Sequence, residues 1–137
     1  MAMLGDLIYE GNIKIIGTRV LNAEENRIEH TNSSEGKFKD IDGSFLGTFW
    51  VIPVGKDVFY GEGQHVITTK DGGETATFRG YGIERLNTES KRSSFRGSVF
   101  FKASSNGRLA FLNNIVGAFE TEANESGQGV VKIWEWK

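Results

Sequence analysis

The chain has 137 residues, of which 38% are hydrophobic and 25% charged, so its length and composition fit one globular domain, residues 1–137, with a single core. Eighteen acidic residues stand against sixteen basic ones, and the scattered Lys and Arg argue against a nucleic-acid partner. The absence of cysteine excludes disulfides, thiolate nucleophiles and iron–sulfur clusters.

The first residues carry neither a basic region nor a long apolar stretch. No apolar run approaches the roughly 20 residues of a membrane-spanning helix. We therefore expect a soluble, cytoplasmic protein without membrane association. His30 and His65 are the only histidines, and no glycine loop joins a strand to a helix, so we expect neither a metal nor a cofactor.

Glycine and phenylalanine dominate the pattern along the chain. Eighteen glycines and ten phenylalanines occur with a single proline, and the glycines recur inside apolar, β-branched and aromatic stretches. This pattern is typical of strands and turns. In chain order, we expect strands over residues 11–23, 43–54, 58–69, 74–86, 93–104, 109–122 and 129–136, with room for a short helical turn within 108–116.

The connections between these strands are mostly short. We expect an antiparallel meander of neighbouring strands, because short links favour hairpins. The exception is residues 24–38, the longest and most polar connection, which we predict to be a mobile loop. Long strands with one proline would leave exposed edges, so an all-β, closed or nearly closed barrel of about eight strands is the predicted fold.

Glycines predict the register of one hairpin. If Asp71-Gly72 is a two-residue turn, cross-strand partners sum to 143, which pairs Gly61 with Gly82 and Gly63 with Gly80. Barrel curvature, an aromatic side chain packed on bare backbone, or space for a ligand would each explain this glycine patch, and curvature is favoured. Residues of the same parity include Phe59, His65, Ile67, Ala76, Phe78 and Glu84.

Several segments resemble a group of small uncharacterised microbial proteins. They are Gly61-Glu62-Gly63, Asp71-Gly72-Gly73-Glu74, Phe78-Arg79-Gly80-Tyr81-Gly82, Arg96-Gly97, Leu109-Ala110-Phe111-Leu112-Asn113, Gly117-Ala118-Phe119-Glu120 and Trp134-Glu135-Trp136. That group is similar in fold to allene oxide cyclase and the plant dirigent proteins, whose eight-stranded barrels hold apolar substrates in the lumen. The resemblance covers about residues 57–137 and implies a barrel, and it supplies no catalytic motif.

The other face of the central hairpin carries the candidate ligand-binding residues Glu62, Arg79 and Tyr81, with Arg96 on the next strand. If this face lines the lumen, Arg and Glu could orient a carboxylate or carbonyl group and Tyr81 could donate a proton. If it faces solvent, these are ordinary cross-strand pairs, and the solvent-facing interpretation is favoured. The register alone does not decide between the two.

Glu120 is the fifth candidate ligand-binding residue, because it lies in an apolar stretch where its pKa could be raised. Pairing with Lys132 across the last hairpin is the plainer interpretation. His65 would lie roughly 20 Å from Glu84 at about 3.3 Å per residue, so no dyad is expected, and a packed core histidine is favoured. His30, in the predicted loop, carries no signal.

Residues 45–52 are apolar on both strand parities, so both faces need cover, and we expect a homodimer. Two functional hypotheses remain. The first is a barrel that binds an apolar or amphipathic small molecule in its lumen. The second is a cofactor-independent isomerase, cyclase or lyase-like enzyme acting on an apolar substrate. The absence of a catalytic triad or metal cluster favours the first.

Overall fold

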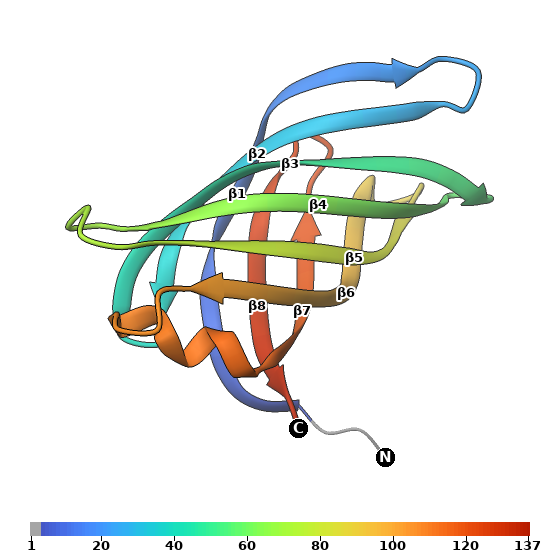
Figure 1. Cartoon of the computed structure of the whole chain (residues 1–137). Helices are drawn as coiled ribbons and strands as arrows, with labels where there is room; N and C mark the ends of the chain where they lie inside the picture. Colours follow the sequence, from blue (N-terminus) through green and yellow to red (C-terminus); the bar gives the residue numbers. More distant parts are fainter. Residues whose placement is uncertain (1–3) are drawn as a thin grey trace.

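Eight antiparallel strands close into a barrel in sequence order, which confirms the predicted fold (Figure 1). A computed structural model describes residues 4–137 of the chain. The elements are β1 (Leu4–Asn22), β2 (Arg27–Phe38), β3 (Ile41–Gly55), β4 (Val58–Thr69), β5 (Thr75–Asn87), β6 (Arg92–Ala103), the 3-10 helix η1 (Arg108–Asn114), β7 (Val116–Ala123) and β8 (Gln128–Trp136).

The predicted loop over residues 24–38 is wrong, because most of it is strand β2, paired with both β1 and β3. The inward-facing side chains of β2 include Asn32 and Ser34, which are buried although polar. Tyr9 satisfies Ser34 through a hydrogen bond of 2.6 Å between the two hydroxyl oxygens. Buried polar residues of this kind hide the apolar alternation that identifies a strand in a sequence.

The predicted strand over residues 109–122 divides into a helix and a strand. Residues 108–114 form η1, and β7 begins only at Val116. Leu109 and Leu112 are both buried. Their spacing of three residues matches one turn of a 3-10 helix, so the two side chains share one face and cap the core at this end of the barrel.

The predicted glycine register is confirmed. Gly61 pairs with Gly82 and Gly63 with Gly80. The turn itself is longer than the two residues expected: Thr69 N donates to Glu74 O at 3.0 Å, which leaves residues 70–73 as the loop. Gly72 has a φ of 76°, a left-handed conformation that favours glycine. A four-residue loop over residues 70–73 has the same centre as a two-residue turn at 71–72, so the strand residues pair as predicted.

Two of the three explanations for the glycine patch apply to separate glycine pairs. The ring of Phe95 packs on the Gly61–Gly82 pair, where added Cβ atoms would lie 2.7 Å from Cζ and 2.8 Å from Cε1 of that ring. Gly63 and Gly80 instead line a cavity in the lumen. The face of this hairpin that carries the glycines therefore points into the barrel, and the opposite face points outward.

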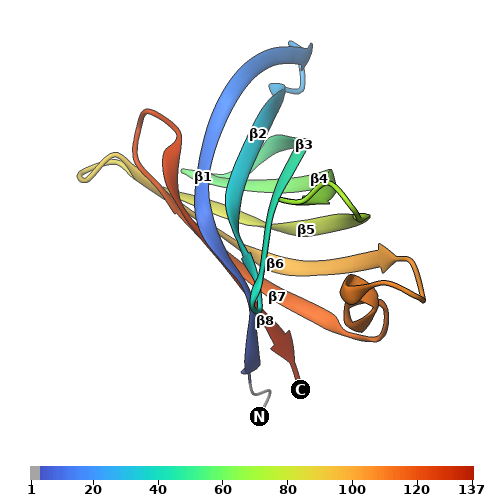
Figure 2. The same cartoon turned by 90° about the vertical axis from the view of Figure 1, so that its left-hand side faces the viewer.

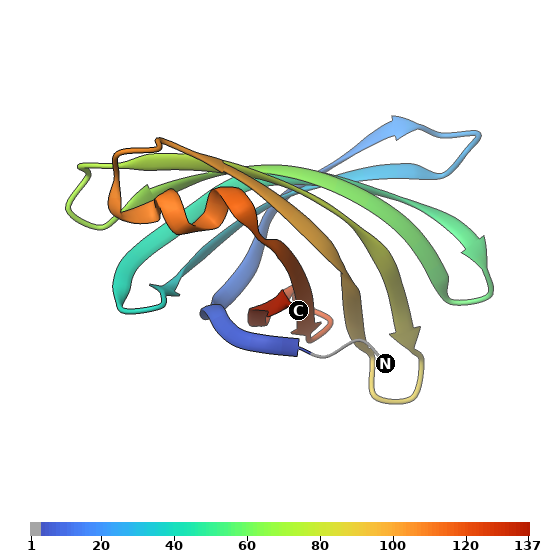
Figure 3. The same ribbon diagram turned by 60° about the horizontal axis from the view of Figure 1, so that its bottom comes forward.

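The two ends of the barrel differ. Helix η1 lies at the end that also carries the β2–β3 and β4–β5 turns (Figures 1 and 3). The buried core includes Tyr9, Phe38, Ile67 and Leu112 near this end. We call this the closed end. The β1–β2, β3–β4, β5–β6 and β7–β8 turns form the opposite, open end, where the β1–β2 hairpin extends beyond its neighbours (Figure 2).

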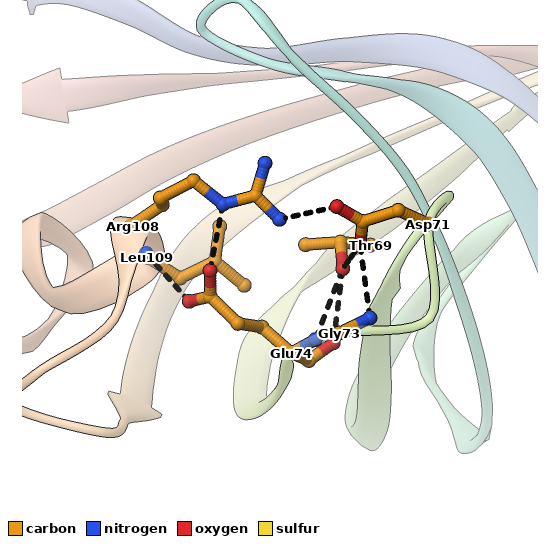
Figure 4. Close-up of polar contacts among 6 residues, drawn as sticks. All are labelled: Thr69, Asp71, Gly73, Glu74, Arg108 and Leu109. Carbon is orange, nitrogen blue, oxygen red and sulfur yellow. Dashed lines mark hydrogen bonds and ion pairs between the residues drawn. The ribbon is translucent and has the colours of Figure 1, made fainter.

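A polar cluster fastens η1 to the β4–β5 turn (Figure 4). Arg108 Nη2 contacts Asp71 Oδ2 at 2.8 Å, and Arg108 Nε contacts Glu74 Oε2 at 2.8 Å. The backbone N–H of Leu109 donates to Glu74 Oε1 at 3.3 Å, which satisfies one of the free donors at the helix start. Within residues 4–137, no helix combines the length and the apolar character needed to cross a membrane.

Candidate ligand site in the barrel lumen

A cavity of about 100 Å³ occupies the lumen between the packed core and the open end. Its lining residues come from the inner faces of the strands, apart from Gly127 in the β7–β8 turn, and most are apolar or glycine. They are Ile13, Ile15, Asn32, Phe45, Phe49, Gly63, His65, Phe78, Gly80, Glu84, Ser93, Phe95, Val99, Phe119, Thr121, Ala123, Gly127, Val131 and Ile133. Such an apolar wall with a few polar groups is typical of small-molecule sites.

His65 is the buried polar group at the deep end of this cavity. Its ring lies across β3 on bare backbone at Gly47, where an added Cβ would come within 2.6 Å of the ring Cγ. It reaches Asn32 on β2, with 2.7 Å between His65 Nε2 and Asn32 Oδ1. One ring face stacks on Phe78, with 4.5 Å between the ring centroids.

The protonation of His65 follows from these contacts. An amide oxygen only accepts hydrogen bonds, so Nε2 carries the proton and donates to Asn32. Burial lowers the pKa of His65 to about 4, so the ring is neutral at pH 7. Its Nδ1 is buried and has no hydrogen-bond partner. The deep end therefore holds one free acceptor.

Glu84 is the charged group of the cavity wall and lies nearer the open end, on β5. Its cross-strand neighbours are Phe59 on β4 and Phe95 on β6, and Phe95 in turn pairs with Thr121 on β7. Burial raises the pKa of Glu84 above its ordinary value. Within residues 4–137, no hydrogen bond or ion pair reaches its carboxylate.

The five residues that the sequence singled out lie on the outside of the barrel instead. Glu62, Arg79 and Tyr81 do come together, in a shallow depression on the outer face of β4 and β5. Tyr60 donates a hydrogen bond of 3.0 Å to Glu62 Oε2 in that region. The face chosen for its polar pattern is thus the outer one, so these side chains do not reach the luminal cavity.

Arg96 and Glu120 also point outward and contact each other. Arg96 Nε lies 3.5 Å from Glu120 Oε2, and Arg96 Nη2 lies 3.4 Å from Glu122 Oε1. Lys132 is the cross-strand neighbour of Glu120, as expected, but its ammonium group contacts Glu10 at 3.8 Å. Glu120 therefore belongs to an exposed ion-pair network rather than to an apolar lumen.

Two luminal side chains of the open half, Glu84 and His30, are not among the predicted ligand-binding residues. The strand pattern places Glu84 on the same face as the glycines, and it predicts no dyad between Glu84 and His65. His30 lies on β2, with 2.8 Å between its Nδ1 and Thr18 Oγ1, and its ring centroid lies 5.2 Å from that of Phe49. Burial lowers its pKa. If β2 is recognised as a strand, His30 and Asn32 lie two residues apart and therefore on the same, inward-facing side of it.

Among residues 4–137, no group of three His, Asp or Glu side chains is placed so that it could hold a metal ion. No family model and no curated protein matches the chain. Solved structures do resemble it. A conserved protein of unknown function from Rhodopseudomonas palustris superimposes with a TM-score of 0.78 at 15% identity, over 98% of this chain and 99% of the other.

A second solved structure, a protein of unknown function from Clostridium acetobutylicum ATCC 824, superimposes with a TM-score of 0.77 at 14% identity. The match covers 96% of this chain and 97% of the other. At such identities the likeness establishes the fold alone. The chain therefore shares a complete eight-stranded barrel with proteins whose functions are unknown.

Proposed function

We propose that this barrel binds a compact apolar or amphipathic small molecule in its lumen. The observation that carries the proposal is the luminal cavity, whose wall is apolar apart from a few inward-facing polar groups that include His65 and Glu84. The resemblance to allene oxide cyclase and dirigent barrels, which hold apolar substrates in the same place, supports it by analogy of fold.

The volume of the cavity limits the ligand. An apolar cavity of about 150 Å³ accommodates benzene, and the lumen here offers about 100 Å³ before any side chain moves. A single ring or a short chain is the largest group that fits with small side-chain adjustments. A longer ligand would have to extend through the open end.

The test is thermal denaturation with compact neutral ligands such as phenol and benzyl alcohol. A ligand that binds only the folded state raises the melting temperature, and the shift grows as the ligand concentration rises above the dissociation constant. Ala123→Leu narrows the mouth of the cavity and should abolish the shift. Ala118→Leu is the matched control, since Ala118 lies on the outer face of the same strand β7.

Two outcomes would overturn the luminal proposal. One is the absence of any shift in the wild type at millimolar ligand concentration. The other is an equal shift in the wild type and in Ala123→Leu, because a ligand that ignores the narrowed mouth binds elsewhere.

Proton transfer is the second candidate function, in line with a cofactor-independent isomerase. Glu84 favours it, because burial in an apolar cavity raises the pKa of this carboxyl and so favours its use as a proton donor or acceptor. Such an activity would exchange the protons beside the carbonyl of acetophenone for deuterium in D₂O, a reaction that NMR follows. A rate no faster than in buffer, or unchanged in Glu84→Gln, would contradict it.

We also propose that two copies associate through the outer face of the four neighbouring strands β3 to β6. Leu46, Val66 and Phe100 are 53%, 50% and 49% exposed on that face. A second copy would cover this apolar surface. Sedimentation velocity should give a dimer for the wild type and a monomer for Val66→Lys. A wild type that remains monomeric at a protein concentration on the order of 100 micromolar would contradict the proposal.

A further inference from the structure

In the part of the chain that the structure describes, the wall of the luminal cavity carries an acidic side chain but no lysine or arginine. Among residues 4–137, Glu84 is the acidic residue on the cavity wall, and no Lys or Arg lines it. His65 is neutral at pH 7 because burial holds its pKa at about 4. A bound ligand therefore meets one acidic side chain, Glu84, and, among the described residues, no side chain of the cavity wall that is positively charged at pH 7.

Among residues 4–137, Glu84 has no hydrogen-bond or ion-pair partner. Every Arg and Lys ion pair among the described residues goes to another acid. A half-buried carboxylate with neither a cation nor a hydrogen-bond donor remains imperfectly solvated. A donor supplied by a ligand would compensate for that loss.

The flanking residues favour a cationic donor. Phe59 and Phe95 are the direct cross-strand neighbours of Glu84, on either side of it, and directly opposite residues have Cβ atoms about 4.5–5.5 Å apart. An ammonium group at the carboxylate would thus lie beside aromatic rings. Aromatic faces attract cations, most strongly where water is excluded.

We propose that the ligand of this lumen is a compact apolar amine, whose ammonium group binds Glu84 and whose hydrocarbon body extends inward toward Phe78 and His65. This inference rests on the proposed luminal function and specifies its ligand class. A carboxylate ligand is disfavoured, because it would bring a second negative charge beside Glu84 with no cation to balance either.

Three ligands of nearly equal shape separate the charge from the hydrocarbon: 2-phenylethylamine, 2-phenylethanol and phenylacetate. Their dissociation constants are measured at pH 7.5 by calorimetry. We expect the amine to bind at least about tenfold more tightly than the alcohol, because a hydrogen bond to a charged group contributes about 1.5–3 kcal/mol. Phenylacetate should bind most weakly.

Glu84→Gln keeps the shape of the side chain and removes its charge. The preference for the amine over the alcohol should fall to less than about threefold in this variant, while the alcohol binds as in the wild type. Glu89→Gln is the matched control, since Glu89 is an exposed acid in the adjacent β5–β6 turn; it should retain the wild-type preference. Removing an unpaired carboxylate should not lower the melting temperature, which verifies folding.

The outcomes distinguish the ligand class from the luminal function. Equal binding of amine and alcohol to the wild type overturns the amine inference and leaves luminal binding intact. An amine preference that persists in Glu84→Gln also overturns it, since the cation then binds another acid. If none of the three ligands, nor the neutral ligands tested above, binds the wild type, both proposals fail.

Discussion

His65 on β4 donates a hydrogen bond of 2.7 Å to Asn32 on β2, and its ring spans β3 between them. The span is possible because Gly47 pairs with both residues and has no side chain under the imidazole. A glycine in one strand thus joins polar groups of its two neighbours.

Loss of Asn32 should leave His65 Nε2 as a buried donor without a partner. We expect Asn32→Ala to destabilise the fold by about 1–3 kcal/mol, the usual cost of an unsatisfied buried polar group. Urea denaturation measures it. A double-mutant cycle with His65→Phe should give a coupling above about 0.5 kcal/mol; additive effects would contradict the hydrogen bond.

His65 should also make stability depend on pH. Its pKa is about 4 in the folded chain, against an ordinary 6.5, so the unfolded state binds more protons between these values. Stability should therefore fall as the pH drops from 6.5 toward 4. For His65 alone the loss between pH 7.5 and pH 5 should be about 2 kcal/mol, at 1.36 kcal/mol per pKa unit.

The control for this effect is His65→Phe, which keeps the stack on Phe78 and removes the titration. Denaturant midpoints at pH 7.5 and pH 5 should differ less for the variant than for the wild type. The pKa of His30 is also lowered and acts in the same direction in both proteins. An identical pH dependence of the two would mean that His65 is not held neutral by burial.

Gly63 and Gly80 should differ in their tolerance of a methyl group. A Cβ at Gly63 would lie 2.8 Å from Phe49 Cβ and 3.1 Å from the carbonyl oxygen of Thr48, neither of which moves without the backbone. At Gly80 the nearest atom is Val99 Cγ1 at 3.2 Å, on a side chain. Chemical denaturation should give a cost of about 1–3 kcal/mol for Gly63→Ala and a smaller one for Gly80→Ala; the reverse order would contradict this register.

Asp71 should titrate well below its ordinary range. Its pKa is lowered to about 2 by hydrogen bonds from the Gly73 N–H, the Thr69 hydroxyl and the Arg108 guanidinium, in that order. Stability that this carboxylate supplies is present above its ordinary pKa and is lost as the pH falls through about 2. Arg108→Gln should raise the pKa part of the way back toward 3.8.

Carbon-13 NMR of the Asp71 carboxyl follows this titration. Lys70→Gln is the control, because Lys70 is an exposed neighbouring cation with no ion pair to Asp71 among the described residues. It should leave the pKa nearly unchanged. An Asp71 pKa that is insensitive to Arg108→Gln would remove the ion pair of Figure 4 as a contributor.

The sequence by itself determined the all-β class, the meander and the glycine register, because turn glycines and strand alternation are local signals. It did not determine that 27–38 is a strand, because Asn32 and Ser34 face inward with partners far along the chain. Only the tertiary structure decided which face lines the lumen. In the closed barrel, the strand face that carries His65 and Glu84 points into the lumen, and the face that carries Glu62 and Arg79 points outward. The alternation of residues along a strand would be the same if the two faces were exchanged, so the sequence pattern does not distinguish them.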